Sequence, residues 1–132
     1  MFDHLSTYAT DFDATKKFYD GALAALGYSV QMEFVAGWNT DFPTQRMCAY
    51  GPNGQPNFWV IEVKSAYTPR HLAFAADNRK AVDAFYQAAI KADGSDNGKP
   101  GLRPLYHEHY YGAFVLDPDG NNIEAVCHLA EG

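Results

Sequence analysis

The sequence has few cysteines, no excess of positive charge and no long apolar run. Its 132 residues include only Cys48 and Cys127, too few for a disulfide scaffold, so we expect reduced thiols and a cytoplasmic location. Ten basic residues against sixteen acidic ones leave a formal net charge of −6, which disfavours binding to nucleic acid or to anionic lipid. No apolar stretch approaches the roughly 20 residues that a transmembrane helix needs. The N-terminus shows no basic segment followed by an apolar one, so we expect no secretory signal.

What remains is an ordinary globular composition. Apolar residues make up 47% of the chain and charged residues 20%, which argues against disorder. A chain of this length can bury one hydrophobic core without disulfides or structural metals. We therefore expect a single domain over residues 1–132. The aromatic content of 15% is high and suits a lined pocket or a subunit interface, although plain core packing would also account for it.

The chain repeats itself once. His4-Leu5 recurs as His71-Leu72, and at the same spacing Phe18-Tyr19 recurs as Phe85-Tyr86 and Gly27 as Gly94. Ile61-Glu62-Val63 resembles Ile123-Glu124-Ala125 at a shorter spacing, which indicates a deletion in the second half. Matches in one register predict a duplicated fold, and such repeats decide the architecture.

Hydrophobic periodicity supports this division. The patterns predict strands at 4–10, 28–35, 45–50 and 57–63 around a helix at 13–26, and then strands at 71–76, 110–116 and 121–127 around a helix at 78–92. Residues 93–104 are rich in Gly and Pro and are expected to be irregular, so the corresponding strand of the second half is only weakly marked. The prediction is an α+β fold of two βαβββ modules, 1–63 and 71–132, whose curved mixed sheets surround a central cavity.

Alternation along the strands brings chemically active side chains to one face. His4 and His71 stand opposite the apolar faces that the helices should cover, and Glu124 does the same in the last strand. In the strand at 57–63, alternation places Glu62 with them, on the face that also carries Val60, and leaves Trp59, Ile61 and Val63 for the helix side. Two imidazoles with one or two carboxylates form a plausible site for a divalent ion such as Zn, Ni, Mn or Fe. The plainer alternatives are hydrogen-bonded or solvent-exposed His side chains, a solvated Glu124 and pairing of Glu62 with Lys64.

The same residues resemble a known family. His4-Leu5, Phe18-Tyr19, His71-Leu72-Ala73-Phe74 and above all the stretch from Phe114 to Glu124, with its D-P-D-G-x-x-I-E pattern, are similar to the glyoxalase/bleomycin-resistance/extradiol-dioxygenase group, the vicinal oxygen chelate superfamily. The resemblance covers essentially the whole chain. It implies paired βαβββ modules, a homodimer and a metal held by His4, His71 and Glu124, with Glu62 near the place of a further carboxylate.

The resemblance implies a function class and leaves the reaction open. We expect a metal-dependent lyase or isomerase-like enzyme acting on a small oxygen-bearing or thiol-conjugated molecule. In a glyoxalase-type mechanism Glu124 or Glu62 would move the proton, and in a dioxygenase His107 or His109 would act as acid or base. The alternatives are a metal-free protein that sequesters a small molecule or drug, as bleomycin-resistance proteins do, and a structural dimerisation domain.

Further side chains are candidates for contact with the substrate. Tyr106 and His109 belong, with His107, to the densest polar and aromatic run in the chain. Tyr8 and Trp38 are expected to line the pocket, although Trp38 would equally suit a dimer contact. Arg46 and Arg103 could hold an anionic substrate, and surface charge is the plainer interpretation.

Overall fold

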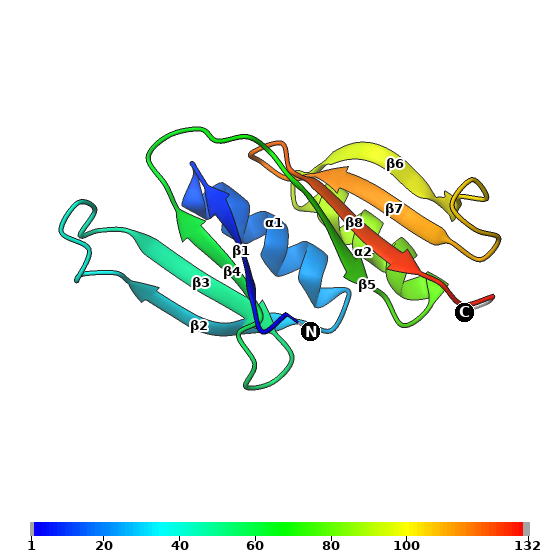
Figure 1. Ribbon diagram of the computed structural model, residues 1–132, viewed down its shortest axis with the longest axis horizontal. Helices are drawn as coiled ribbons and strands as arrows, with labels where there is room; N and C mark the ends of the chain where they lie inside the picture. Colours follow the sequence, from blue (N-terminus) through cyan, green and yellow to red (C-terminus); the bar gives the residue numbers. More distant parts are fainter. Residues whose placement is uncertain (1, 131–132) are drawn as a thin grey trace.

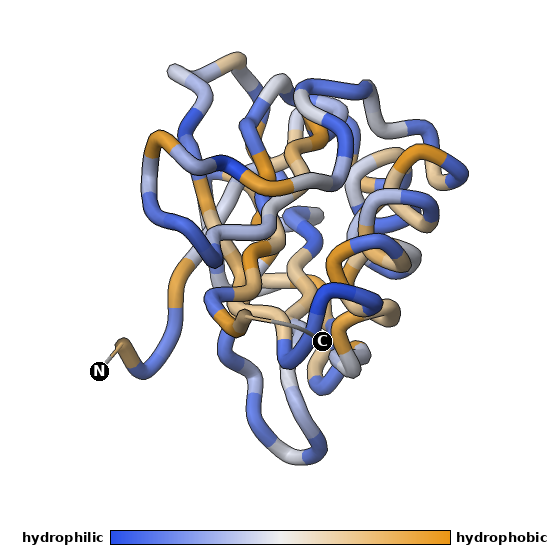
Figure 2. Tube along the Cα trace, turned by 90° about the vertical axis from the view of Figure 1, so that its right-hand side faces the viewer, coloured by the Kyte–Doolittle hydropathy of each residue, from blue (hydrophilic) through white to orange (hydrophobic). Residues whose placement is uncertain are grey.

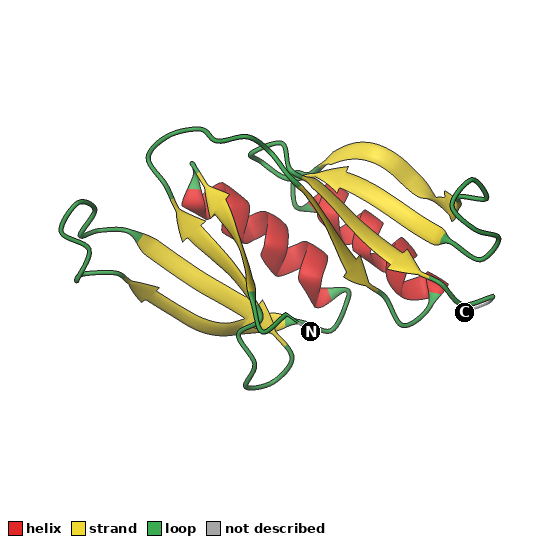
Figure 3. Cartoon of the chain, in the orientation of Figure 1, coloured by secondary structure: helices red, strands yellow, loops and turns green. Residues whose placement is uncertain are grey.

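The computed structural model describes residues 2–130, and these form the ten elements drawn in Figures 1 and 3. The first half contains β1 (Leu5–Ala9), α1 (Phe12–Ala24), β2 (Ser29–Val35), β3 (Arg46–Gly51) and β4 (Phe58–Glu62). The second half contains β5 (His71–Ala75), α2 (Arg79–Lys91), β6 (Ser95–Leu102), β7 (Tyr111–Leu116) and β8 (Asn122–Cys127). The predicted order β-α-β-β-β is therefore confirmed in both halves.

Each half folds into a four-stranded mixed sheet with the same strand order. Sheet A runs β1-β4-β3-β2 and sheet B runs β5-β8-β7-β6. In both sheets the first and last strands of the module pair in parallel, and the other pairs are antiparallel. The repeat is thus visible in the topology, and the predicted fold class of two βαβββ modules is confirmed.

Both helices begin at capping side chains. The side chain of Asp11 accepts a hydrogen bond from the Ala14 amide at 3.1 Å, and the side chain of Asn78 accepts one from the Ala81 amide at 2.8 Å. These bonds satisfy donors that a helix N-terminus leaves without an intrahelical partner. Within residues 2–130 neither helix is long and apolar enough to cross a bilayer.

The helices cover one face of each sheet. α1 packs on sheet A, α2 packs on sheet B, and the two helices pack against each other. In the side view of Figure 2 the helices lie on one side of the molecule and the strands on the other. One core cluster contains side chains from both halves, including Phe18, Val60, Phe85 and Ile123. We call the sheet surfaces that point away from the helices the open faces.

Two features of the strands differ from the prediction. Val60 is fully buried in the core, so the helix side of β4 carries Val60 and not Trp59, the reverse of the expected faces. The stretch that was expected to be irregular contains β6, an edge strand with two irregularities in its pairing to β7. Gly and Pro are unfavourable in strand interiors, but they are compatible with a bulged edge strand, and this is why the pattern was misleading.

The Asp-Pro-Asp-Gly turn between β7 and β8 connects the two halves. The Asp117 carboxylate, only 5% exposed, accepts hydrogen bonds from the Tyr19 hydroxyl of α1 at 2.6 Å and from the Asn121 amide at 2.9 Å. In the segment between β4 and β5, the Tyr67 hydroxyl lies 2.7 Å from the Asn121 side chain, and the Arg70 amide donates a hydrogen bond to that side chain. The Asp-Pro-Asp-Gly turn of the most family-specific stretch is therefore a structural connection between the two modules.

This connection predicts that Tyr19→Phe destabilises the protein. Burial, and then the charge of Asp117, raise the pKa of Tyr19 well above its usual value, so the hydroxyl remains a donor. Its loss leaves the buried Asp117 oxygen with one donor fewer, and we expect the free energy of unfolding to fall by about 1–3 kcal/mol. Urea denaturation measures the change, and an unchanged midpoint would contradict the structural role of this bond.

A close contact after α2 gives a second prediction. A Cβ atom on Gly94 would lie 2.5 Å from Phe18 Cε1 and 2.6 Å from Val115 Cγ1. Gly94→Ala should therefore destabilise the protein by about 1–3 kcal/mol through overpacking. Gly37→Ala is the matched control, because nothing lies within 4 Å of a Cβ there. Equal urea midpoints for the two variants would refute the close approach.

Candidate functional site

The open face of sheet B carries a buried carboxylate with two hydrogen-bond partners. Glu124 in β8 is 1% exposed although it points away from the core side of its strand. Its Oε1 atom lies 2.8 Å from Nε2 of His71, the first residue of β5, and its Oε2 atom accepts a hydrogen bond from the Tyr110 hydroxyl. A buried carboxylate is costly unless such partners satisfy it. The structure therefore brings His71 and Glu124 together, as the sequence predicted, and adds Tyr110.

The strand register explains how these side chains meet. In sheet B, Ala73 of β5 and Phe114 of β7 flank Glu124 on either side. Gly112 leaves room for the cluster, because a Cβ atom there would lie 3.3 Å from Glu124 Oε2 and 3.2 Å from Tyr110 Cε1.

The chemistry of the cluster follows from its protonation. Burial, and then the hydrogen bond to Glu124, hold the pKa of Tyr110 well above its usual value, so the phenol remains a donor at neutral pH. If His71 donates through Nε2 to the carboxylate, its neutral ring carries the lone pair on Nδ1. The His71 side chain is 53% exposed, so a small molecule can reach the ring. The arrangement can accept or deliver a proton, and its imidazole and carboxylate are also metal-ligand types.

A second cluster of rings surrounds Tyr110. Tyr106, His107 and His128 pack on the Tyr110 ring with centroid distances of 4.8, 5.5 and 5.3 Å. His107 Nε2 lies 2.8 Å from His128 Nδ1, and His107 Nδ1 accepts the His109 amide. His107 and Tyr106 therefore support Tyr110, whereas the side chains that hydrogen-bond to the Glu124 carboxylate within residues 2–130 are those of His71 and Tyr110.

His109 lies at the edge of this cluster, with its Nε2 atom 3.4 Å from Glu108 Oε1. Its predicted contact with a substrate stays a prediction, as do the catalytic role of His107 and the substrate contact of Tyr106.

His4 stands apart from His71 within one chain. Its Nδ1 atom lies 2.6 Å from Asp3 Oδ1, and its side chain is 55% exposed. It borders a shallow pocket of about 430 Å³ on the open face of sheet A, whose other lining residues include Ser6, Phe34, Met47, Trp59 and Ile61. Among residues 2–130, no three His, Cys, Asp or Glu side chains come together in a group that could hold a metal ion.

The two sheets are equivalent in register and differ in side chains. Leu5 of β1 lies beside Phe58, as Leu72 of β5 lies beside Ile123. His4 and His71 each precede these leucines, so the two imidazoles occupy equivalent positions. One residue further, Ser6 lies beside Trp59 where Ala73 lies beside Glu124. Trp59, rather than Glu62, therefore takes the place of Glu124 in sheet A.

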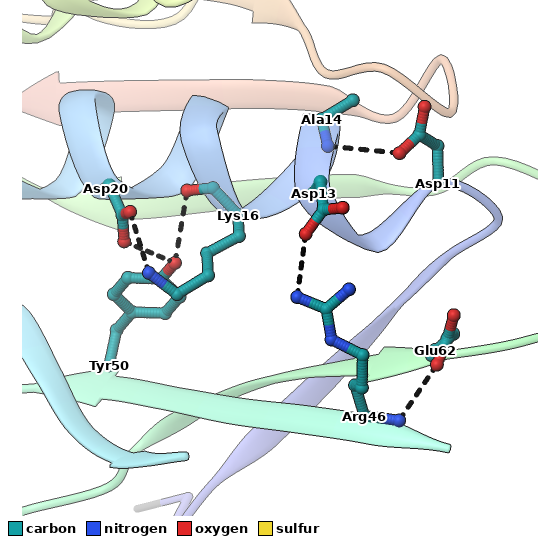
Figure 4. Close-up of polar contacts among 8 residues, drawn as sticks. All are labelled: Asp11, Asp13, Ala14, Lys16, Asp20, Arg46, Tyr50 and Glu62. Atoms are coloured by element: carbon teal, nitrogen blue, oxygen red, sulfur yellow. Dashed lines mark hydrogen bonds and ion pairs between the residues drawn. The ribbon is translucent and has the colours of Figure 1, made fainter. Parts of the chain in front are cut away.

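Glu62 lies on the helix side of sheet A. It pairs in register with the buried Ala9, and its Oε1 atom accepts the Arg46 amide at 2.9 Å. Figure 4 shows that Arg46, whose amide bonds to Glu62, extends its side chain to Asp13 of α1. The sequence match placed Glu62 three residues away from the true equivalent of Glu124. An odd shift reverses the face of a strand, so Glu62 is not brought to the candidate site.

Tyr8 and Trp38, which were also predicted to contact the substrate, lie at the end of sheet A opposite to His4. The Tyr8 ring packs against Tyr67 at 5.5 Å with the Arg70 guanidinium 5.2 Å from its centroid. Trp38 is 70% exposed and packs on Phe34 at 5.5 Å. Their contact with a substrate stays a prediction.

Sequence reasoning missed Tyr110 and His128. Tyr110 belongs to the polar and aromatic run that the sequence showed, but its hydroxyl reaches Glu124 only because the chain turns from the loop into β7. His128 follows β8 and carries no local signal.

The cluster predicts a measurable role for the Tyr110 hydroxyl. Tyr110→Phe removes a donor from a buried carboxylate, and we expect the free energy of unfolding to fall by about 1–3 kcal/mol. Tyr106→Phe is the control, because Tyr106 is 64% exposed and packs on the same ring. Its change should stay within about 0.5 kcal/mol. Equal urea midpoints for both variants would show that the bond to Glu124 contributes nothing.

Comparison with known proteins agrees with this architecture. Over 94% of its length the chain is 26% identical to the Bacillus subtilis (strain 168) protein named uncharacterized protein YqjT, and the match covers 96% of that protein. The structure resembles a glyoxalase/bleomycin resistance protein from Albidiferax ferrireducens T118, with a TM-score of 0.75, 26% identity and coverage of 96% and 98% of the two chains. A glyoxalase I mutant from Zea mays shares the fold, with a TM-score of 0.69, 17% identity and coverage of 95% of this chain and 46% of the maize chain.

A family model gives the assignment its widest support. The model of the Glyoxalase/Bleomycin resistance protein/Dioxygenase superfamily matches residues 1–125, which cover the first module and most of the second, including Glu124. The resemblance seen in the sequence is thereby confirmed, and the chain belongs to this superfamily.

Proposed function

We propose that the protein is a metal-dependent enzyme of this superfamily that acts on a small oxygen-bearing molecule at the open face of sheet B. The observation that carries the proposal is the contact between the half-exposed imidazole of His71 and the buried carboxylate of Glu124. A lyase or isomerase-like reaction fits an acid–base cluster of this kind, because both reaction types need protons moved at defined atoms.

The side chains of one chain supply two of the ligands for such a metal. His71 and Glu124 offer an imidazole nitrogen and a carboxylate oxygen, which suit Zn, Ni, Mn or Fe. The third donor in the proposal is His4, which occupies the equivalent position of the other module but stands apart in the single chain. We therefore propose a homodimer in which the open face of sheet A of one copy covers sheet B of the other.

The two sheets would have different roles, sheet B in the reaction and sheet A in binding the apolar part of the substrate. A bound metal would stabilise negative charge developing on a substrate oxygen. Tyr110 would hold the Glu124 carboxylate in place, and the half-exposed His71 ring would be accessible to the metal and to the substrate. The pocket of sheet A, with Phe34, Met47 and Trp59, would take up the apolar part of the molecule and exclude water.

A second candidate function has its own supporting observation. Both oxygens of Glu124 already have partners within the chain, in His71 and Tyr110. The cluster is satisfied without an ion, as a metal-free protein that sequesters a small molecule would require.

Metal analysis of mixed dimers tests the proposal. Protein purified without a chelating tag should bind about one divalent ion per chain, and His4→Ala and His71→Ala should each abolish binding. A heterodimer of these two variants, isolated through two different tags, retains one intact shared site. We expect about half of the wild-type ion content, measured by elemental analysis after titration with Zn, Ni, Mn and Fe(II).

A matched heterodimer controls this experiment. When His71→Ala is combined with Glu124→Gln, both sites of the dimer carry a damaged sheet B, and no ion should be recovered. Ion binding that no heterodimer restores would contradict a shared site. Wild-type protein that binds no ion at all would refute metal dependence and favour the sequestering function.

A further inference from the structure

Arg103 lies on the open face of sheet B beside the Glu124 cluster. Its guanidinium carbon is 5.4 Å from the centroid of the Phe114 ring. Phe114 pairs directly with Glu124 in the register of β7 and β8, and directly paired residues share a face. The Phe114 ring also lies 6.2 Å from the His71 ring, between centroids. The guanidinium therefore stands over the same surface as the cluster.

Glycines in β6 make room for this guanidinium. A Cβ atom on Gly98 would lie 3.3 Å from Arg103 Nη2 and 2.9 Å from the Phe114 ring, and one on Gly101 would lie 3.2 Å from Nη1. The Nη2 atom donates to the Lys99 carbonyl at 2.6 Å. The Phe114 ring, the two glycines and the Lys99 carbonyl together hold the guanidinium against the sheet.

The charge of Arg103 is not neutralised within the described chain. Among residues 2–130, Arg46 alone of the four arginines forms an ion pair, with Asp13, and no carboxylate lies within 4.0 Å of Arg103, Arg70 or Arg79. The side-chain bonds of Arg103 go to the carbonyls of Lys99 and Leu102, so several of its five N–H groups have no anionic acceptor. Arg103 differs from the other unpaired arginines in its position, because its guanidinium lies over Phe114 beside His71 and Glu124.

We infer that Arg103 binds a carboxylate group of the substrate, and that the substrate class is a small organic acid. A planar guanidinium binds carboxylates through two parallel hydrogen bonds. Neighbouring strands lie about 4.8 Å apart, and Glu124, Phe114 and Gly98 stand on three successive strands. An acid whose carboxylate is bound by Arg103 would thus place a second oxygen, a few bonds from that carboxylate, near His71 and Glu124. This second half of the inference rests on the proposed function.

A second arginine supplies a matched control. The Arg79 guanidinium lies 5.2 Å from the Tyr111 ring centroid and donates to the Leu129 carbonyl, so it has similar contacts. Tyr111, however, packs against the core and bonds to Asp83 of α2, on the helix side of sheet B. Loss of Arg79 should not affect an anion on the open face.

Titrations with paired acids and amides test the inference. Lactate, mandelate and malonate are compared with lactamide, mandelamide and malonamide, which differ from them in charge. In ¹⁵N and ¹³C NMR spectra at least one acid should give saturable shifts of the Arg103 Nε–H group and of the His71 ring, and its amide should bind about tenfold more weakly or worse. R103M should weaken binding of the acid about tenfold or more, and R79M should leave it unchanged.

The outcomes separate this inference from the proposed function. Failure of all three acids to shift Arg103, equal binding of acid and amide, or equal effects of R103M and R79M would each overturn it. The comparison of acid with amide uses the wild-type protein and does not depend on how a variant folds. Metal content is measured on the same samples, and R103M should retain the wild-type value. Acid binding in a protein that takes up no ion would support Arg103 while refuting the metal.

Discussion

The burial of one carboxylate, Glu124, is the constraint on which the rest of this site depends. Removing a carboxylate from water costs several kcal/mol unless hydrogen-bond donors replace the water. Here the hydrogen-bond partners are the His71 ring at the start of β5 and the Tyr110 hydroxyl just before β7. Gly112 leaves space for this cluster, because a Cβ atom there would lie 3.2 Å from Tyr110 Cε1 and 3.3 Å from Glu124 Oε2. The polar chemistry of the protein is therefore fixed by the strand register of sheet B.

The duplication gives two sheets of one topology with different open faces. Sheet B carries Glu124, and sheet A carries Trp59 at the equivalent position, beside a pocket with apolar lining. The open face of sheet B is thus acid–base in character and that of sheet A is mostly apolar, whereas His4 and His71 occupy equivalent positions in the two modules. The Asp117 turn, which resembles the family most closely in sequence, holds the modules together through Tyr19 and Asn121 and lies outside the site.

Much of this architecture can be predicted from internal matches and periodicity together. The matches reveal the repeat, and alternation then gives the faces of β1, β5 and β8, which brings His71 and Glu124 to one face of sheet B. The position of Glu62 differs from the prediction because the Ile-Glu match is not a structural equivalence: the strand pairing makes Trp59, three residues before Glu62, the equivalent of Glu124. Tyr110, His128 and the position of Arg103 depend on how a loop and an irregular edge strand are folded, and periodicity carries no information there.

We propose that Glu124 and His71 of one chain form half of a metal site that His4 of a second copy completes. Crystals grown with Co(II) and measured at the cobalt absorption edge test it most directly, because the anomalous difference map locates the ion without assumptions. We expect a peak bounded by His71, Glu124 and the His4 side chain of a neighbouring copy. A saturated crystal with no peak at Glu124, or with a peak that His4 does not contact, would contradict it.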